Sequence, residues 1–225
     1  MNRNIIVTGG GGNLGQEVIR KFKREGFRVI AIIRPESGDE IEEADDVYEV
    51  DLAVEESVEE FSKEYILQYG ELDALALLAG GFQGGTIDNT PLHLLNDMVK
   101  LNFHTAYNMV RAFLPLMKRT KKGTFILVSA KSSLQPAMGK SAVAYSLSKS
   151  LLIHLADLIS EEAPGTGIRA HVFVPSILDT PPNREAMKNQ DSSKWVSLTK
   201  LAEAMHYGVI TPSLSNTIFK FYGGI

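Results

Sequence analysis

Tyr145 and Lys149 are four positions apart in a stretch whose apolar pattern predicts a helix over 143–161. Residues with this spacing project from the same face of a helix, so both side chains can reach one ligand. A tyrosine ordinarily has a pKa of about 10, and a neighbouring ammonium that favours the phenolate brings it toward useful acid–base behaviour. The pair therefore indicates proton transfer, although an exposed face of any long helix can show the same spacing.

A glycine-rich segment, VTGGGGNLG from Val7 to Gly15, joins the first predicted strand to the first predicted helix. Glycines permit positive φ and remove side chains that would block a phosphate, and the N–H groups at the start of the helix attract the anion. A merely flexible turn would also be rich in glycine. The strand before it and the helix after it favour a site for a dinucleotide pyrophosphate.

Arg34 follows the second predicted strand, where many NAD-binding units place an acid for the adenosine ribose. An arginine there can instead pair with a 2′-phosphate, which favours NADP over NAD as the cofactor. The alternative is a solvated surface arginine, and the acidic segment 39–49 nearby is unfavourable to a phosphate. A second glycine-rich segment, AGGFQGG from Ala79 to Gly85, is either a place where backbone approaches a flat ligand or simply a loop.

Short β-branched runs alternate with longer amphipathic segments, which is typical of repeated βαβ units and a buried parallel sheet. Strands are predicted over 4–8, 28–33, 47–50, 74–79, 124–129, 169–174 and 217–221. Helices are predicted over 14–24, 54–69, 91–117, 143–161 and 198–205, with Thr90 capping the third ahead of Pro91. The expected fold class is α/β: a single Rossmann-type doubly wound domain over 1–225, with helices on both faces of a seven-stranded parallel sheet.

Composition argues against several classes of function. The chain has 225 residues and a formal charge of −4, which suits one domain and gives no reason to expect nucleic acid as a partner. It contains no cysteine, and its five histidines lack the spacing of metal ligands, so no metal site is expected. No segment is apolar enough to span a bilayer and no signal-peptide pattern is present, which predicts a cytoplasmic protein without a membrane partner.

Five motifs in order along the whole chain, VTGGGGNLG, AGG, LN, YSLSK and VPSILDT, resemble the short-chain dehydrogenase/reductase family. The resemblance implies an NAD(P)-dependent oxidoreductase that reduces a carbonyl or imine-like small molecule by hydride transfer, with Tyr145 as proton donor. It implies that Lys149 lowers the pKa of the phenol and holds the nicotinamide ribose, and that Asn102 supports a water-linked proton path to Lys149. Members of the family form homo-oligomers, so a homodimer or a homotetramer is expected.

The same resemblance assigns cofactor contacts to the pyrophosphate turn, to the adenine and ribose positions, and to a segment after the sixth strand. The residues expected to bind the cofactor are Thr8, Gly9, Gly12, Asn13, Leu14, Gly15, Arg34, Asp51, Leu52, Ala79, Gly80, Gly81, Lys149, Pro175, Ile177 and Thr180. Asn13 departs from the family by replacing the middle glycine. A short polar loop near 180–198 would cover the substrate, and Trp195 within it either closes over a flat ligand or packs inside.

The serine of the family's catalytic set has no clear counterpart. The register of the fifth strand places Ala130 at the serine position, whereas counting back from Tyr145 by the usual spacing reaches Ser132, and Ser129 also lies at the strand end. We favour Ala130, which leaves polarisation of the substrate to Tyr145, alone or with help from Ser132. The expected catalytic residues are Tyr145, Lys149, Asn102 and Ser132.

Two alternatives remain open. The missing serine and the strings AGGFQGG, SAKSSL and LDTPPNR are similar to the dihydropteridine reductase branch, whose electron-poor quinonoid substrate needs less polarisation. Asn102 and Arg34 fit a general NADP-dependent reductase better. The alternative from another class is a non-catalytic NAD(P)-binding sensor, against which the presence of both Tyr145 and Lys149 argues.

Overall fold

Seven parallel strands form the centre of the structure, a computed structural model that describes residues 3–224. The strands are β1 (Arg3–Thr8), β2 (Phe27–Ile33), β3 (Asp46–Glu49), β4 (Ala74–Leu77), β5 (Lys122–Val128), β6 (Gly167–Pro175) and β7 (Ile218–Phe221). Their order across the sheet is β3-β2-β1-β4-β5-β6-β7, and every neighbouring pair is parallel. The order reverses between β1 and β4, and ligands of such sheets bind beyond the strand ends at this reversal.

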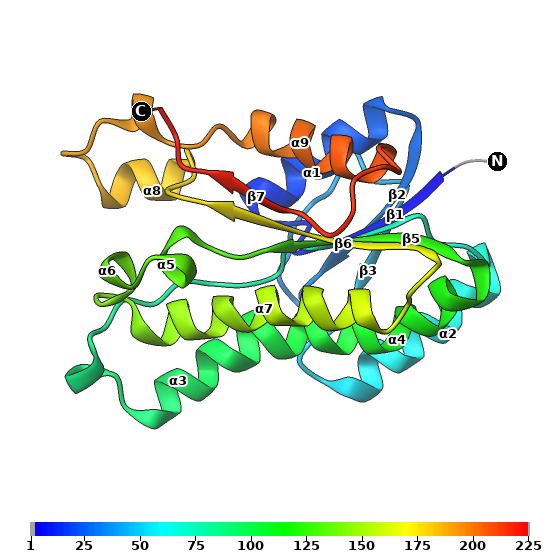
Figure 1. Ribbon diagram of the computed structural model, residues 1–225. Helices are drawn as coiled ribbons and strands as arrows, with labels where there is room; N and C mark the ends of the chain where they lie inside the picture. The colour runs from blue at the N-terminus through cyan, green and yellow to red at the C-terminus, as the bar shows by residue number, and fades with distance from the viewer. Residues whose placement is uncertain (1–2, 225) are drawn as a thin grey trace.

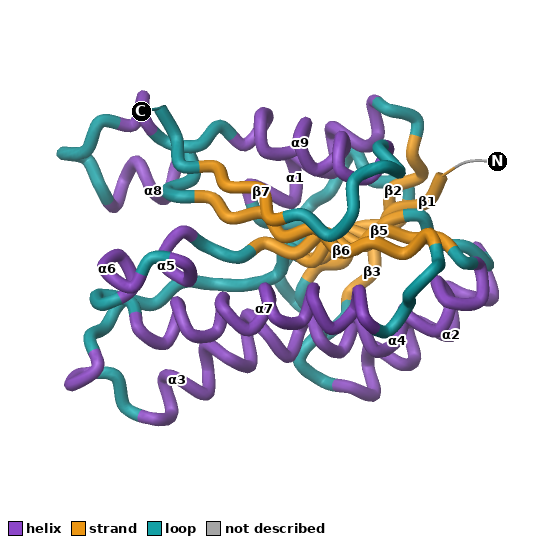
Figure 2. The backbone as a smooth tube through the Cα atoms, in the orientation of Figure 1, coloured by secondary structure: helices purple, strands orange, loops and turns teal. Residues whose placement is uncertain are grey.

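Helices cover both faces of the sheet, as Figure 1 shows. Helices α1 (Asn13–Arg24) and α9 (Leu198–Ile210) lie together on one face, and α2 (Glu55–Tyr69), α4 (Thr105–Thr120) and α7 (Val143–Glu161) lie on the other. In Figure 2 the strands run between these two layers. The α/β fold with helices on both faces of a seven-stranded parallel sheet is confirmed.

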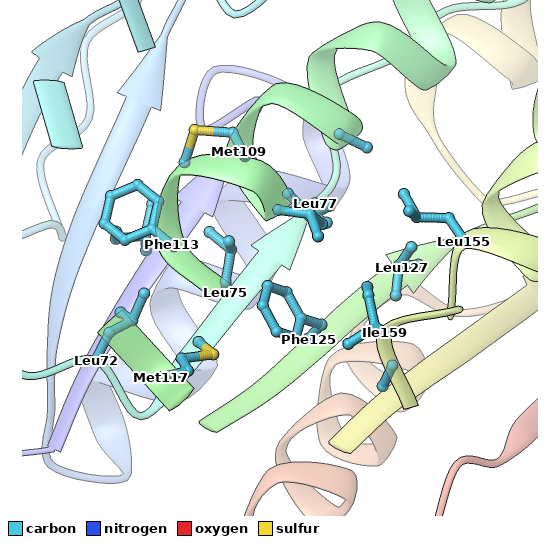
Figure 3. Packing of buried hydrophobic residues seen from close by; sticks show 14 of the residues in the cluster. Leu72, Leu75, Leu77, Met109, Phe113, Met117, Phe125, Leu127, Leu155 and Ile159 are labelled. Atoms are coloured by element: carbon cyan, nitrogen blue, oxygen red, sulfur yellow. The ribbon is translucent and has the colours of Figure 1, made fainter. Parts of the chain in front are cut away.

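Successive residues of the central strands are buried on opposite faces of the sheet. On β4, Leu75 and Leu77 join the core under α2, α4 and α7, whereas Ala74 and Ala76 join the core under α1 and α9. Figure 3 shows Leu75 and Leu77 in the same cluster of buried side chains as Phe113 of α4. Burial on both faces explains why these strands appear in the sequence as continuous apolar runs, and close packing makes the strand ends a rigid support for a site.

The helix expected over 91–117 is interrupted in its middle. It comprises α3 (Leu92–Val99), a π-helical segment from Lys100 to His104, and α4, which continues to Thr120. The prediction that Thr90 caps this helix is wrong: its hydroxyl donates to the carbonyl of Thr86 at 2.6 Å, and Pro91 occupies the N-cap position. Single π-helical turns occur often at functional sites, and this one contains Asn102.

Three short helices and a longer C-terminal helix differ from the expected elements. Helices α5 (Lys131–Leu134) and α6 (Pro136–Gly139) follow β5, and α8 (Pro181–Ala186) follows β6, so part of the expected substrate loop is helical. Figure 1 places all three at the end of the sheet toward which the strand arrows point. Helix α9 continues to Ile210, beyond the expected end at 205.

Arg169 on β6 connects the sheet to the C-terminal end of α9. Its Nη1 donates to the carbonyl oxygens of Gly208 at 3.4 Å and Thr211 at 2.6 Å. Its Nη2 donates to the carbonyl of Val209 at 2.8 Å and to Oγ1 of Thr124 at 2.9 Å. The last carbonyls of a helix have no partner within the helix, so one guanidinium satisfies acceptors that helix geometry leaves open.

We expect the Arg169→Met substitution to lower the free energy of unfolding by about 2–4 kcal/mol, because several partly buried acceptors lose their donor. The matched control is Arg119→Met on the exposed surface of α4, which should change it by less than about 0.5 kcal/mol. Urea denaturation of the two variants measures both changes, and equal midpoints would contradict the capping role.

Candidate active site

The first glycine-rich turn lies between the end of β1 and the start of α1. Gly9 has a φ of +67°, and a Cβ on Gly15 would lie 2.1 Å from the carbonyl oxygen of Gly9, so the turn closes tightly only with glycine at both positions. Gly12 is the N-cap of α1 and offers no side-chain hydrogen bond to its first turn. Asn13 begins the helix and is exposed. The turn therefore presents bare backbone at a helix N-terminus, as a pyrophosphate site requires.

Thr8 brings the second glycine-rich segment beside this turn. Its buried hydroxyl donates to the carbonyl of Ala76 at 3.2 Å and accepts from the N–H groups of Leu78 at 2.9 Å and Ala79 at 3.1 Å. These bonds join the carboxyl ends of β1 and β4. The hydroxyl thus positions the two turns next to each other at the point where the strand order reverses.

Asn102 and Lys149, from different helices, converge on Gly80. A Cβ on Gly80 would lie 2.4 Å from Oδ1 of Asn102 and 3.1 Å from Nζ of Lys149. Any larger residue at this position would displace one of these polar groups. The second glycine-rich segment is therefore a close approach of backbone to two polar side chains, which a loop alone would not require.

The side chain of Asn102 links this segment to helix α7. Its Oδ1 accepts from the N–H of Gly81 at 2.9 Å, and its Nδ2 donates to the carbonyl of Gly81 at 3.1 Å and to Oγ of Ser148 at 3.0 Å. Ser148 in turn donates to the carbonyl of Tyr145 at 2.8 Å. The amide group of Asn102 thus donates both to the loop at Gly81 and to Ser148 on α7, which was not expected. Ser148 was not predicted either, although a polar residue on the buried face of α7 could have indicated it.

Lys149 is buried, with 6% of its surface exposed, and its Nζ donates to the carbonyl of Val128 at 2.9 Å. An ammonium has three N–H donors, and among residues 3–224 it meets this one acceptor. The remaining donors fit a ligand with paired oxygens, such as the ribose diol of a dinucleotide. Burial lowers the pKa of Lys149 to about 8 and raises the pKa of Tyr145 to about 12. At neutral pH the lysine is charged and the tyrosine is protonated.

One aromatic side chain, Phe82, lies beside Tyr145. The rings of Tyr145 and Phe82 are 5.0 Å apart and meet edge to face, while 70% of the surface of Phe82 is exposed. Gly85 connects the loop that carries Phe82 to the start of α7. Its N–H donates to the carbonyl of Ser141 at 2.8 Å, and its carbonyl accepts from the N–H of Val143 at 2.9 Å. Phe82 was not among the predicted residues. An aromatic residue between two glycine pairs was the available signal.

The three candidates for the serine position differ in their surroundings. Ala130 follows β5 and is buried as the N-cap residue of α5. Ser129 is also buried, and its hydroxyl donates to the carbonyl of Lys149 at 2.8 Å, which supports the helix rather than a ligand. The hydroxyl of Ser132 is enclosed and has no hydrogen-bond partner among the described residues. Neither serine presents an open hydroxyl in this structure.

The residues expected at the adenosine end lie beyond β2 and β3. Arg34 is exposed directly after β2. Asp51 is exposed after β3 and its carboxylate accepts from the N–H of Ala53 at 3.0 Å, while Leu52 is buried beneath it. Since β2 and β3 are neighbours, the structure brings Arg34 and Asp51 to the same corner of the sheet.

The residues expected at the nicotinamide end follow β6. Pro175 ends the strand, the carbonyl of Ile177 accepts from the N–H of Val196 at 2.8 Å, and the buried Thr180 caps α8. These contacts hold the segment against the chain that precedes α9. Trp195 in that chain is only 9% exposed, which favours the packing role over closure across a ligand.

No group of three His, Cys, Asp or Glu side chains within residues 3–224 has a metal-binding arrangement. None of the described helices combines the length and hydropathy of a membrane span. The site at the carboxyl end of the sheet consists of glycine-rich backbone, a lysine, a tyrosine and an asparagine.

Solved structures with the same fold cover the whole chain. The structure of ElxO with NADP bound superposes with a TM-score of 0.89 at 19% identity and covers 100% of this chain and 98% of its own. Ligand-free aldohexose dehydrogenase from Thermoplasma acidophilum superposes with a TM-score of 0.87 at 21% identity, over 99% of this chain and 93% of its own. These similarities support the fold described above.

Sequence comparisons give the family. Dihydropteridine reductase from Dictyostelium discoideum is 27% identical over 91% of this chain and 87% of its own length. Ipsdienol dehydrogenase from Ips pini is 30% identical over 98% of this chain and 95% of its own length. Residues 3–191 match the family model described as short chain dehydrogenase. The chain therefore belongs to the short chain dehydrogenase family of oxidoreductases.

Proposed function

We propose that this oxidoreductase uses a nicotinamide dinucleotide to reduce a carbonyl or imine-like small molecule, with Tyr145 as the proton donor. The observation that carries the proposal is the convergence of Lys149 and Asn102 on Gly80, next to the bare turn at the N-terminus of α1. A nicotinamide, when bound, supplies the hydride, and the protein supplies binding, orientation and electrostatics. The absence of a side chain at Gly80 lets these two polar groups lie directly against the backbone of the second glycine-rich segment.

Each polar side chain has one task in this proposal. The protonated hydroxyl of Tyr145 gives its proton to the substrate oxygen or nitrogen, and the charged Lys149 stabilises the phenolate that remains. Two donors of Lys149 that meet no acceptor among the described residues would hold the ribose diol. Asn102 would support a water-linked path to Lys149, and its side chain already fixes α7 through Ser148.

The remaining assignments extend this proposal along the carboxyl ends of the strands. The turn from Thr8 to Gly15 would bind the pyrophosphate, Asp51 and Leu52 the adenine, and the segment from Pro175 to Thr180 the nicotinamide. Ala130 would leave substrate polarisation to Tyr145, since the hydroxyl of Ser132 is enclosed. A small substrate would enter from the side of Phe82, the exposed residue beside Tyr145.

The proposed cofactor preference is NADP over NAD, on the strength of Arg34. We expect the Arg34→Ala substitution to weaken NADPH binding by about tenfold, because a 2′-phosphate loses a charge-assisted partner. NADH binding should change by less than about twofold. Fluorescence titration of both dinucleotides measures the two affinities, with Arg24→Ala on the exposed end of α1 as the matched control. An equal loss for NADPH and NADH would contradict the role of Arg34.

A second candidate is reduction of a quinonoid pterin. Two observations favour it: Ala130 stands at the serine position in our register, and the exposed ring of Phe82 offers a flat wall beside Tyr145. The 27% identity to dihydropteridine reductase from Dictyostelium discoideum points to the same substrate class. An electron-poor ring accepts hydride without strong polarisation, so loss of the serine hydroxyl would matter less.

The test is NADPH and NADH oxidation by the purified protein against a quinonoid dihydropterin, a quinone and a small ketone. Turnover of any of these supports the proposal, and turnover of the pterin alone supports the second candidate. Tight binding of a dinucleotide without turnover of any of these three compounds would favour the alternative of a non-catalytic sensor.

We also propose that the chain forms a homodimer or homotetramer through the outer face of α7 and α4. Leu147, Leu151 and Leu158 are exposed on α7, and Tyr107 is exposed on α4. Apolar side chains gathered on a helical layer are typical of an interface with a second copy. Light scattering of the purified protein gives the mass in solution, and a monomer at micromolar concentration would contradict the interface.

A further inference from the structure

The glycine-rich turn shares a corner of the sheet with the residues that follow β2. The N–H of Gly10 donates to the carbonyl of Ile32 at 3.0 Å, and a Cβ on Gly10 would lie 3.1 Å from Cβ of Ala31. The turn therefore rests on the last residues of β2, the strand that ends directly before Arg34. A ligand that extends along this turn toward β2 therefore meets the side chains of the loop that follows β2.

That loop places the carboxylate of Asp39 over the turn. A Cβ built on Gly11 would lie 2.1 Å from Oδ2 and 2.8 Å from Oδ1 of Asp39, so the carboxylate occupies the space that a side chain at position 11 would fill. Asp39 comes from a segment that the sequence marks only as acidic. Its contact with the turn distinguishes it from an acid that merely faces solvent.

The backbone of the loop explains how Asp39 returns to the turn. The N–H of Ser37 donates to the carbonyl of Arg34 at 3.2 Å, which closes a turn immediately after β2. Glu36 and Gly38 have φ values of 57° and 68°, so the chain reverses direction at these residues. The N–H of Asp39 donates to Oγ of Ser37 at 3.4 Å. Arg34 and Asp39 thus lie at the two ends of one short chain reversal, and the end at Asp39 lies beside Gly11.

We infer that Asp39 opposes Arg34 in the choice of cofactor, by repelling a 2′-phosphate at the corner where Arg34 attracts it. This inference rests on the proposed binding of a dinucleotide along the glycine-rich turn. A carboxylate accepts hydrogen bonds from ribose hydroxyls, whereas a phosphate in their place adds like charge against it. The wild-type preference for NADPH over NADH is then the difference between attraction by Arg34 and repulsion by Asp39. It is smaller than the preference that Arg34 alone would give.

Asp39→Asn keeps the shape of the side chain and one acceptor oxygen, and it removes the charge. We expect this variant to bind NADPH about 3- to 20-fold more tightly, a range set by partial solvent screening at an exposed site. NADH affinity should change by less than about twofold, because the amide oxygen still accepts from a hydroxyl. The matched control is Glu40→Gln, which removes the charge of the next exposed residue in the same loop.

Isothermal titration with NADPH, NADH, adenosine 2′,5′-bisphosphate and adenosine 5′-monophosphate measures these affinities without turnover. The expected result is tighter binding of the two 2′-phosphorylated ligands to Asp39→Asn alone, with an effect that shrinks at 0.5 M salt, on the order of a 4 Å screening length. An unchanged ratio of NADPH to NADH affinity, or the same gain in Glu40→Gln, overturns the inference while leaving the proposed function intact. A wild-type protein that binds neither dinucleotide overturns both.

Discussion

Replacing Tyr145 by phenylalanine is expected to lower kcat/KM for the reduced substrate by roughly 10²- to 10⁴-fold, the range that a positioned general acid contributes. The change removes one hydroxyl and keeps the ring that meets Phe82 at 5.0 Å. Helix α7 keeps its position, because Ser148 donates to the backbone carbonyl of residue 145 and not to its side chain. The loss should therefore appear in the chemical step, with cofactor affinity unchanged within about twofold.

The control for this experiment is Tyr207→Phe, a tyrosine with 53% of its surface exposed on α9. Its turnover and its cofactor affinity should match those of the wild type. Steady-state rates with whichever of the pterin, quinone or ketone is turned over give kcat/KM for the wild type and both variants. Fluorescence titration gives the affinity of each protein for NADPH. Equal rates for wild type and Tyr145→Phe would remove Tyr145 from the mechanism.

The strands could be predicted because their residues are buried on both faces of the sheet. Ile5, Ile6 and Val7 of β1 are fully buried and contribute alternately to the two cores, so the sequence shows an unbroken apolar run. Such a run, repeated between amphipathic segments, is typical of a parallel sheet. The order of the strands is a tertiary property, and no residue pattern along the chain encodes it.

The interruption of the long helix before α7 could not be predicted. The apolar positions of 91–117 continue through the π-helical segment without a break, and no proline or glycine marks Asn102. The reason for the insertion lies in contacts across the fold, since Asn102 reaches both Gly81 and Ser148. Tertiary hydrogen bonds of this kind override the local helical pattern.

The candidate site likewise has one part that the sequence could predict and another that it could not. The spacing of Tyr145 and Lys149 was enough to place both on one helix, and the flanking apolar patterns placed the glycine-rich turn between a strand and a helix. The approach of Asp39 to Gly11 was not predictable, because it depends on a chain reversal through Glu36, a residue that rarely adopts positive φ. Sequence therefore indicates which side chains carry charge, while the loop conformation decides which of them face a ligand.

The pH dependence of reduction should be governed by Lys149. Burial lowers its pKa to about 8, and burial raises the pKa of Tyr145 to about 12. Below pH 8 the lysine is charged and stabilises the phenolate that Tyr145 becomes after it gives up its proton. Above pH 8 this charge is lost while Tyr145 stays protonated, so kcat/KM should be constant below pH 8 and fall by about tenfold per pH unit above it.

The Lys149→Met substitution should lower kcat/KM by roughly 10²- to 10⁴-fold at pH 7 and abolish the decline above pH 8, because the titrating group is gone. The methionine fills similar volume at a buried position, so the far-ultraviolet circular dichroism should be unchanged. Lys200→Met, at an exposed lysine paired with Glu203, is the matched control and should keep the wild-type profile. Rates of NADPH oxidation between pH 6 and pH 10 in all three proteins test this. A decline that persists in Lys149→Met would assign the titration to another group, and the charge on Lys149 would then have no part in proton transfer.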